Sequence, residues 1–306
     1  MNTGYVITTN GLTKSYKGKP AVDHVSMKVH KGDIYGFIGR NGAGKSTTLK
    51  MLCGLVYPTA GEIQLFEGSV MDEAARRRIG ILIEEAGLYP NLTARENMML
   101  KARYLGLVSD DSVDQALELM NISDTGKKKV KNFSMGMKQR LGIAMALLGN
   151  PDLLILDEPI NGLDPEGIRE IRECLQRLNE QAGKTIIISS HILGELSKLA
   201  NRYGIIKDGQ LVQQITKEEL EERCKDYLKV EVDDADRASV VLSENFPGIT
   251  YEVFGGNQLH VYDFTDSGSV TALLVENKVS VLSCAFHRMD LEQYFLELME
   301  GGIHND

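Results

Sequence analysis

Residues 39–46 read Gly-Arg-Asn-Gly-Ala-Gly-Lys-Ser and match the pattern G-x-x-x-x-G-K-[ST] at every position, which leaves few folds open to the chain. An apolar run, 34–38, precedes them and a helix-forming stretch, 46–55, follows them. In this setting the glycines allow a tight turn whose backbone N–H groups point at phosphates, while the helix presents its positive end. The segment therefore predicts a phosphate-binding loop, to which Lys45 adds a point charge and Ser46 a ligand for Mg²⁺.

The composition is that of an ordinary globular protein. With 306 residues, of which 42% are hydrophobic and 25% charged, the chain is long enough for one large domain and a small one. Four cysteines without a C-x-x-C pair indicate neither a zinc site nor a disulfide framework, and they fit a reducing cytoplasm: Cys53, Cys174, Cys224 and Cys284. No signal peptide is indicated, and the longest apolar run, 141–149, falls short of a membrane span. We therefore expect a chain that does not cross a membrane by itself.

Charge is distributed unevenly along the chain. Residues 217–306 carry 7 Lys and Arg against 19 Asp and Glu, a net charge of −12, whereas residues 1–216 carry 27 against 24, a net charge of +3. A nucleic-acid-binding protein normally presents a basic face, because neutralising phosphates supplies most of its affinity. The short basic clusters at 76–78 and 127–129 are interpreted as solvated surface residues. We therefore expect no nucleic-acid partner.

The periodicity of apolar residues changes along the chain. Three β-rich segments near the N-terminus predict an antiparallel patch: 5–10, 25–29 and 62–67. Continuous apolar runs at 153–156 and 185–189 predict parallel strands buried on both faces. The helix between them is predicted to begin with Asp164 as its cap and Pro165 in its first position. Residues 93–149 are predicted to be mainly helical. Residues 1–216 therefore predict an α/β nucleotide-binding domain, and about 87–150 form its helical lobe.

The apolar strand at 153–156 ends in two carboxylates, Asp157 and Glu158. Ligands sit at the carboxyl ends of the strands in a parallel sheet. Asp157 is therefore placed to orient Mg²⁺ and its waters. Glu158 is placed to polarise a water that attacks the γ-phosphate, a role that needs a carboxylate within hydrogen-bond reach of that water.

The segment 132–140 resembles the signature motif of ABC ATPases, whose usual form is Leu-Ser-Gly-Gly-Gln. Ser134 and Gly136 match that form, whereas Met135 and Met137 depart from it. The two matching residues are the ones suited to phosphate contact, because a Ser that caps a helix presents its hydroxyl and neighbouring N–H groups to an anion. The resemblance therefore implies that this segment binds the triphosphate.

Three shorter segments resemble further parts of the same family. Residues 189–191, Ser-Ser-His, are similar to the switch-histidine segment, in which His191 would contact the γ-phosphate. Residues 161–164 are similar to the D-loop, and Tyr16 resembles the aromatic residue that stacks on adenine. With the motifs in this order, the resemblance to an ABC transporter nucleotide-binding subunit covers residues from about 5 to 215.

The family resemblance implies a P-loop NTPase fold with an antiparallel β subdomain and a helical lobe, and it implies a site for ATP and Mg²⁺. The implied catalytic residues are Lys45, Glu158 and His191. The implied metal-binding residues are Ser46, Glu84 and Asp157. The implied nucleotide-binding residues are Tyr16, Gly39, Arg40, Asn41, Gly42, Ala43, Gly44, Lys45, Ser46, Thr47, Ser134 and Gly136. In such proteins ATP lies between two subunits, so we expect a dimer with an identical or a homologous ATPase subunit.

Within the family, residues 79–93 and 133–140 resemble the bacitracin and lantibiotic export or immunity type. Glu84 stands where most of the family has the Q-loop glutamine, so a carboxylate there would ligate the metal more strongly or alter coupling to the membrane partner. The resemblance implies that the chain powers export of a peptide or another amphipathic compound. A separate membrane permease would contact residues from about 84 to 150 and hold the chain on the inner face of the cell membrane.

Two alternatives stay open at the level of sequence. Soluble ABC ATPases that act on nucleic acids or ribosomes share these motifs. However, those in translation usually carry two cassettes and those in chromosome maintenance carry long heptad insertions. The second alternative is an ATP-switched regulator with little turnover, which Glu84 favours slightly.

The acidic segment 217–306 has a pattern of its own. Its expected strands are 228–232, 249–254, 258–262 and 279–285, its expected helices are 235–245 and 266–276, and a hairpin turn is expected at 255–257. This order is that of a ferredoxin-like α+β domain. A terminal helix at 291–298 resembles the last helix of many drug-export ATPases. No catalytic cluster is recognised here, so a dimer-stabilising or regulatory role is expected.

Overall fold

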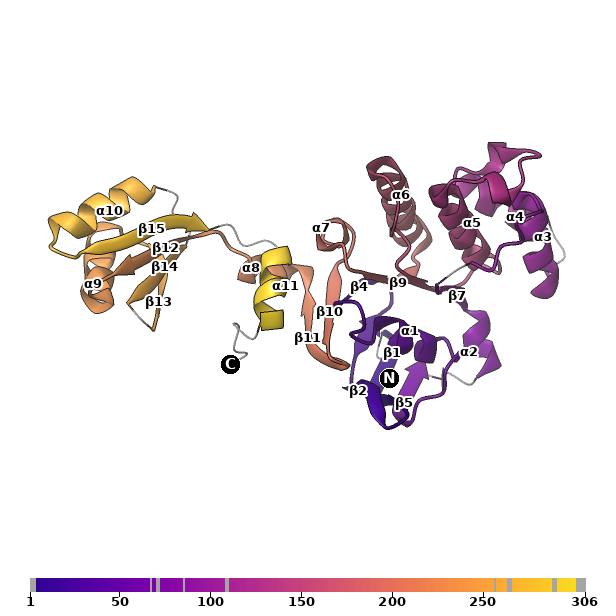
Figure 1. Cartoon of the computed structure of the whole chain (residues 1–306), viewed down its shortest axis with the longest axis horizontal. Helices are drawn as coiled ribbons and strands as arrows, with labels where there is room; N and C mark the ends of the chain where they lie inside the picture. Colours follow the sequence, from indigo (N-terminus) through magenta and orange to yellow (C-terminus); the bar gives the residue numbers. More distant parts are fainter. Residues whose placement is uncertain are drawn as a thin grey trace. The chain divides into compact units, whose positions relative to one another are not determined.

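The computed structural model describes residues 4–66, 68–69, 72–84, 86–107, 110–255, 257–262, 266–287 and 291–300. The chain divides into two compact units, Met1–Lys217 (unit 1) and Glu218–Asp306 (unit 2) (Figure 1). All residues predicted to bind or hydrolyse the nucleotide belong to unit 1.

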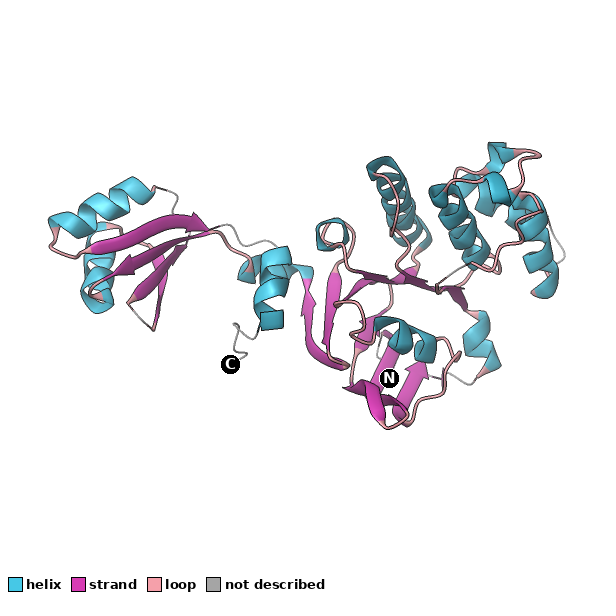
Figure 2. Ribbon diagram, in the orientation of Figure 1, coloured by secondary structure: helices cyan, strands magenta, loops and turns pink. Residues whose placement is uncertain are grey.

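The centre of unit 1 is a six-stranded sheet in the order β11-β10-β4-β9-β8-β7 (Figure 2). Its strands are β4 Ile34–Ile38, β7 Ile79–Leu82, β8 Leu153–Asp157, β9 Thr185–Ser190, β10 Arg202–Lys207 and β11 Gln210–Thr216. Strand β11 is antiparallel to β10, and the other five strands run parallel. Every residue of β4, β8 and β9 is buried, which confirms the prediction of strands covered on both faces. The carboxyl ends of β4, β7, β8 and β9 therefore meet at one edge of the sheet.

Different elements cover the two faces of this sheet (Figure 1). Helix α1 Lys45–Leu52 and the antiparallel strands share one core with the sheet, in which Leu49 of α1 is buried with Phe37 of β4 and Ile155 of β8. The other face carries α6 Pro165–Ala182 and the short α7 Leu193–Leu196. The predicted cap of α6 is confirmed, because the Asp164 carboxylate accepts a hydrogen bond from the Gly167 N–H at 3.3 Å.

The antiparallel sheet differs from the prediction at each of the three predicted segments. Its strands are β1 Tyr5–Tyr16, β2 Lys19–Val25, β3 Lys28–His30, β5 Ala60–Leu65 and β6 Gly68–Ser69. The predicted strand 62–67 is observed at 60–65, and residue 67 lies outside the described residues. The predicted strand 5–10 continues to Tyr16, because Gly11 lies at positive φ where the pairing of β1 with β5 is shifted and so forms a bulge without ending the strand. The predicted strand 25–29 is observed only in part, since Val25 ends β2 and Lys28 begins β3. The buried Thr9 hydroxyl bonds the Val25 carbonyl and the Met27 N–H and so interrupts the ladder between them.

The helical lobe consists of α3 Ala94–Tyr104, α4 Asp111–Leu119 and α5 Met135–Leu147, with short 3₁₀ turns at Ser123–Thr125 and Val130–Asn132. These three helices contact one another, and α5 also contacts β7 and β8 of the central sheet. Helix α3 begins with a capping box, in which Thr93 and Glu96 each bond the other's backbone N–H. The short helix α2 Glu73–Arg77 precedes β7. The lobe is thus attached to the sheet through the packing of α5 on β7 and β8.

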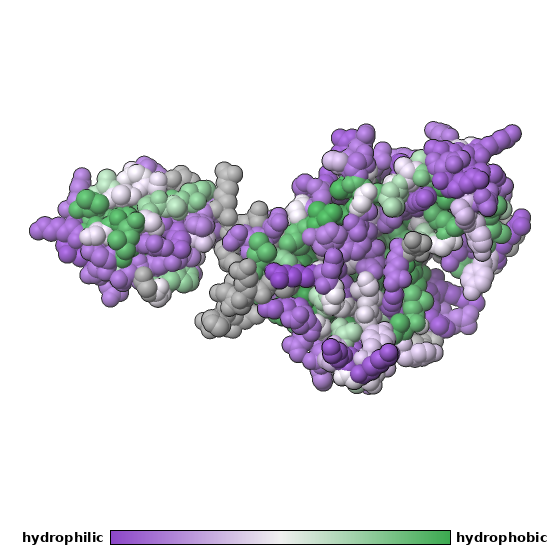
Figure 3. Space-filling view, in the orientation of Figure 1, coloured by the Kyte–Doolittle hydropathy of each residue, from purple (hydrophilic) through white to green (hydrophobic). Residues whose placement is uncertain are grey.

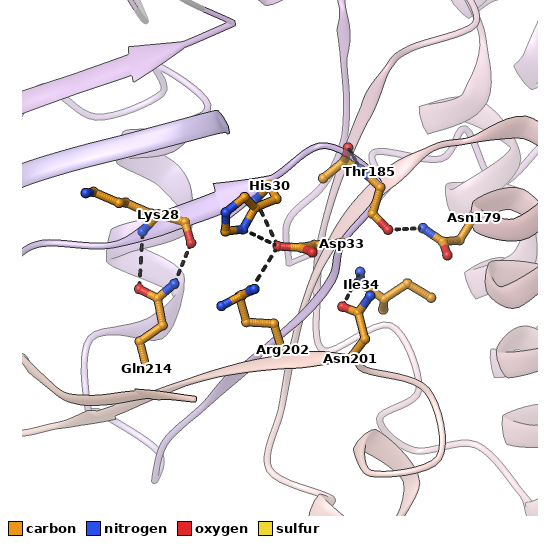
Figure 4. Close-up of polar contacts among 10 residues, drawn as sticks. Lys28, His30, Asp33, Ile34, Asn179, Thr185, Asn201, Arg202 and Gln214 are labelled. Carbon is orange, nitrogen blue, oxygen red and sulfur yellow. Dashed lines mark hydrogen bonds and ion pairs between the residues drawn. The ribbon is translucent and has the colours of Figure 1, made fainter. Parts of the chain in front are cut away.

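A polar network joins the two sheets at the amino ends of the central strands (Figure 4). The Asp33 carboxylate, directly before β4, accepts a hydrogen bond from the His30 N–H at 2.8 Å and pairs with Arg202 at 3.2 Å. The Gln214 amide bonds both backbone groups of Lys28 in β3. This network fixes β4 at the end opposite to the phosphate-binding loop.

Unit 2 contains an antiparallel sheet in the order β13-β14-β12-β15 and two helices. The elements are β12 Tyr227–Val232, α9 Ala235–Asn245, β13 Thr250–Phe254, β14 Gln258–Tyr262, α10 Ser267–Glu276 and β15 Val281–His287. Their order along the chain is the predicted one, and the ferredoxin-like assignment stays a prediction. The strand predicted at 279–285 begins at Val281, two residues later than predicted. The Ser280 N–H donates a hydrogen bond to the Asp233 carboxylate at 2.8 Å and is therefore not paired in the sheet. Of the predicted turn 255–257, residue 256 lies outside the described residues.

Two further helices, α8 Lys217–Arg223 and α11 Leu291–Glu300, flank this β-α-β-β-α-β segment along the chain. The Arg223 guanidinium donates a hydrogen bond to the buried Tyr294 hydroxyl at 3.0 Å. Helix α11 confirms the predicted helix 291–298 and extends it to residue 300. The view in Figure 3 shows a mainly hydrophilic surface with smaller hydrophobic areas.

A half-buried imidazole makes the stability of unit 2 depend on pH. The His260 ring stacks on Tyr227 at 4.0 Å, and burial, with Lys229 nearby, lowers the pKa of His260 to about 4 from 6.5. Between these two pH values the unfolded chain binds a proton that the folded chain does not, so stability falls as the pH drops from about 6.5 to about 4. We expect His260→Gln to reduce this loss, which urea unfolding at pH 7 and at pH ~4.5 would measure. An equal acid loss in both proteins would contradict the prediction.

Candidate nucleotide-binding site

The predicted phosphate-binding loop connects β4 to α1. Gly42 and Gly44 have φ values of 83° and 106°, a region that favours glycine, and a Cβ on Gly44 would lie 2.5 Å from the Ala21 carbonyl oxygen. The Lys45 side chain is buried, and its ammonium donates a hydrogen bond to the Gly39 carbonyl at 2.7 Å. The loop is therefore tightly folded around one positive charge at the N-terminus of α1.

The other predicted residues of this loop vary in exposure. Arg40 and Asn41 are exposed, Ala43 is buried, and Ser46 and Thr47 are half-buried in the first turn of α1. No acidic residue stands in that first turn. The lysine charge, the helix N-terminus and the accessible Ser46 hydroxyl are groups that suit a phosphate and its metal ion.

The two carboxylates after β8 occupy different environments. Asp157 is buried, and its Oδ1 accepts a hydrogen bond from the Ser189 hydroxyl of β9 at 2.5 Å. Glu158 has a φ of 50°, unusual for a residue with a side chain. Its N–H donates to the hydroxyl of Ser189 at 2.9 Å and to the carbonyl of the same residue at 3.2 Å. The chain therefore turns sharply at Glu158, and this turn is held by the neighbouring strand.

This turn brings the three predicted catalytic residues together. Glu158 Oε1 lies 3.5 Å from Lys45 Nζ, and Glu158 Oε2 lies 2.8 Å from His191 Nδ1, which donates the hydrogen bond. The Glu158 side chain is 22% exposed, so water reaches it. A carboxylate between an ammonium and an imidazole, at the edge that carries the phosphate-binding loop, is suited to act on a water beside a bound phosphate.

Glu84 follows β7 at the same edge of the sheet, with a φ of 61°. Its carboxylate accepts a hydrogen bond from Lys50 of α1 at 2.5 Å, and this bond is the main reason that the pKa of Lys50 is raised. Sequence reasoning missed Lys50. A signal existed, because Lys50 follows Ser46 by four residues and therefore lies one helical turn beyond it on the same face.

Tyr16 ends β1 and is 48% exposed. The Lys14 ammonium lies 5.2 Å from the centroid of its ring. Tyr16 is also near enough to Lys50 of α1 to contribute to the raised pKa of that lysine. The ring is thus an accessible aromatic surface beside the helix that follows the phosphate-binding loop.

Ser134 and Gly136 lie elsewhere in unit 1, at the start of α5. The Ser134 hydroxyl is exposed and accepts a hydrogen bond from the Met137 N–H at 3.3 Å, which confirms the predicted helix cap. The neighbour of Gly136 in space is Leu163 of the segment 161–164. Over the described ranges of the chain, no hydrogen bond or ion pair joins Ser134 or Gly136 to residues 39–47. Within the described residues of one chain, Ser134 and Gly136 therefore make no polar contact with the predicted phosphate-binding loop.

Comparisons with known proteins identify the family. The sequence model of the ABC transporter family matches residues 22–161. The bacitracin transport ATP-binding protein BcrA of Bacillus licheniformis is 44% identical over 300 residues, which cover 97% of this chain and 98% of that protein. The chain belongs to the ABC transporter ATP-binding family. The lantibiotic transport ATP-binding protein SrtF of Streptococcus pyogenes is 46% identical over 207 residues, or 68% of this chain and 89% of that protein.

Solved structures of the family agree with this assignment. The dimeric ATP-binding cassette MJ0796 in a post-hydrolysis state, bound to ADP and Pi, is 28% identical with a TM-score of 0.64, over 69% of this chain and 98% of that one. The transporter component cbiO1 from Clostridium perfringens is 26% identical with a TM-score of 0.65, over 80% and 96%. The predicted α/β P-loop NTPase fold is therefore confirmed, and the chain is an ATP-binding, ATP-hydrolysing subunit of an ABC transporter.

Two expectations can be compared with these findings. Relatives that match nearly the whole chain carry the names of transport ATP-binding proteins, so the comparisons do not favour an ATPase that acts on nucleic acid or ribosomes. Across the described part of the chain, the helices are all too short or too polar to span a bilayer.

We expect Gly44→Ala to abolish ATP binding, because the added Cβ would meet the Ala21 carbonyl oxygen at 2.5 Å and the residue would be strained at a φ of 106°. Gly183→Ala is the matched control, since Gly183 also has a positive φ, 61°, but has no atom within 4 Å of its added Cβ and ends α6. Equilibrium binding of a fluorescent ATP analogue would compare the two variants with the unchanged chain. Normal binding by Gly44→Ala would contradict the prediction.

Proposed function

We propose that this chain binds ATP in a dimer with an identical or related cassette, and that its hydrolysis powers export of a peptide antibiotic or another amphipathic compound through a separate permease. The observation that carries the proposal is the Glu158 carboxylate, which lies between the Lys45 ammonium and the His191 imidazole at the loop edge of the sheet. The near full-length similarity to bacitracin transport ATP-binding proteins supports the class of transported compound.

In this proposal the backbone N–H groups of residues 39–47 and the Lys45 ammonium bind the phosphates, with the N-terminus of α1 adding its positive end. Ser46 and Asp157 would hold Mg²⁺, which when bound neutralises charge that develops on the phosphates. Tyr16 offers its exposed ring to the adenine. The buried position of Asp157, with one oxygen bonded to Ser189, leaves its second oxygen for the metal and its waters.

Glu158 is proposed as the general base. A water oxygen attacks the γ-phosphorus while Glu158 accepts the water proton, and the bond from that phosphorus to the bridging oxygen breaks to leave ADP and phosphate. The hydrogen bond from His191 Nδ1 orients the Glu158 carboxylate. Lys45 contacts the same carboxylate at 3.5 Å, so phosphate binding and the position of the base are linked through one ammonium.

Glu84 is proposed as a further metal-binding group. Its carboxylate is paired with Lys50, so it reaches the metal only if this ion pair opens. The pair is largely exposed on the glutamate side, at 66%, and exposed ion pairs contribute only about 0–1 kcal/mol. Loss of the Lys50 pair therefore costs little free energy when a metal takes its place. The exchange would couple nucleotide binding to the segment between β7 and the helical lobe.

The separation of Ser134 and Gly136 from the loop supports a shared site. We propose that Ser134 and Gly136 of the second cassette complete the nucleotide site, with the exposed cap of its α5 facing the phosphates. Two triphosphates then hold the subunits together, and hydrolysis releases them. Phosphate chemistry thereby drives opening and closing.

A groove in unit 1, lined by residues of the proposed region 84–150 and by residue 55 and others within 73–83 before it, supports a permease contact at this surface. The groove has a volume of about 720 Å³ and is lined by parts of α2, β7, α3 and α5. Exposed apolar side chains line it, among them Ile81, Tyr104 and Leu105, and Arg76 and Lys101 add positive charge. An amphipathic helix of the permease would bury these side chains. The chain would then lie on the inner face of the membrane.

We expect Glu158→Gln to lower ATP turnover by about 100-fold or more while ATP binding is retained, because the variant keeps the size of the side chain but removes the base. Turnover would be measured with the permease co-purified, where we expect stimulation of the unchanged chain. Glu180→Gln, which alters an exposed carboxylate near the end of α6, is the control and should behave as the unchanged chain. Normal turnover by Glu158→Gln would reject the role of Glu158.

A further inference from the structure

Ser189 is a buried hydroxyl that contacts both carboxylate residues of the site. It has no exposed surface, and its strand, β9, lies between β4 and β8 in the central sheet. Its hydroxyl donates a hydrogen bond to Asp157 Oδ1 at 2.5 Å and accepts one from the Glu158 N–H at 2.9 Å. One side chain therefore bonds two consecutive residues with different proposed roles, Asp157 as a metal ligand and Glu158 as the general base.

The middle of β9 is packed by apolar side chains without hydroxyl groups. The strand reads Thr-Ile-Ile-Ile-Ser-Ser, and Ile186, Ile187 and Ile188 are fully buried. A buried polar group is costly unless it is hydrogen-bonded, so an apolar residue would suit position 189 equally well if packing alone mattered. The hydroxyl instead uses its donor and one acceptor on the site residues.

The two hydrogen bonds have different consequences. The bond to Asp157 occupies one carboxylate oxygen and fixes the direction of the other, as outer-shell partners do for metal ligands. The bonds to the Glu158 N–H hold that residue at a φ of 50°, a conformation that side chains seldom adopt without support. This conformation directs the Glu158 carboxylate to His191 and Lys45.

We propose that Ser189 is a positioning residue that sets the Asp157 carboxylate for Mg²⁺ and the Glu158 carboxylate for water at the same time. This role rests on the proposed function, because it acts through the groups assigned there. Ser189 contacts neither substrate nor metal in this account. Its loss should therefore affect the rate of hydrolysis and the metal affinity more than the affinity for ATP.

The test compares variants of the full chain. Ser189→Ala should lower kcat about 10-fold or more and weaken Mn²⁺ binding to the ADP-loaded chain, measured by electron paramagnetic resonance, to a similar extent. KM for ATP should stay within about twofold, since the phosphate-binding loop is untouched. Ser189→Thr keeps the hydroxyl, so it should retain most of the kcat and of the Mn²⁺ affinity that Ser189→Ala loses. Ser189→Cys, which keeps the volume but has a weaker donor, should fall between them.

Thr185→Val is the matched control. It also removes a buried hydroxyl from β9, at the opposite end of the strand, where that oxygen accepts a hydrogen bond from the Gly32 N–H at 3.0 Å. Its urea midpoint should shift by about as much as that of Ser189→Ala, while kcat and Mn²⁺ binding stay unchanged. A general loss of stability is thereby separated from a loss of positioning.

The outcomes distinguish this role from the proposed function. If Ser189→Ala keeps normal kcat and Mn²⁺ affinity while Glu158→Gln is inactive, the positioning role is overturned and the proposed function stands. If Glu158→Gln keeps normal turnover, the proposed function and the positioning role of Ser189 are both contradicted. In the Glu158→Gln background, Ser189→Ala should lower kcat by less than it does in the unchanged chain, because only its effect through Asp157 remains. A full additional loss there would also contradict the role.

Discussion

The parallel pairing of β4, β9 and β8 is the constraint on which the site depends. Parallel strands end at the same edge of a sheet, so the phosphate-binding loop, the two carboxylates and His191 are brought together although they are far apart in sequence. The network around Asp33 fixes the other end of β4 and thereby its register. The distances around Glu158 follow from this arrangement, because each side chain extends from the last residues of a buried strand or from the turn after it.

In the proposed mechanism, two subunits contribute to each nucleotide site. The loop edge of unit 1 brings together the groups proposed to act on the phosphates and the attacking water, but Ser134 and Gly136 lie on the helical lobe with no polar contact to residues 39–47 in the described structure. A site divided in this way links catalysis to the approach of two surfaces. The segment after β7 carries Glu84 and leads into the lobe, so it lies between the nucleotide site and the proposed permease groove.

Local signals in the sequence predicted much of this structure. The loop, the buried strands and the caps at Ser134 and Asp164 were predicted, because each depends on neighbouring residues. Contacts set by the order of strands were missed. The Ser189 hydrogen bonds and the Lys50–Glu84 pair join residues more than 30 positions apart, and no periodicity reports which strands are neighbours. The break between β2 and β3 was missed for the same reason, since the interrupting hydroxyl belongs to Thr9 on another strand.

The account rests on the claim that two cassettes complete each nucleotide site. Sedimentation of the Glu158→Gln chain tests this claim most directly, because ATP binds there without being consumed. We predict a monomer without nucleotide and a dimer with ATP, and we predict that Ser134→Glu in the same chain prevents the dimer through repulsion of the phosphates. A Glu158→Gln chain that binds ATP but stays monomeric, alone and with its permease, would contradict the account.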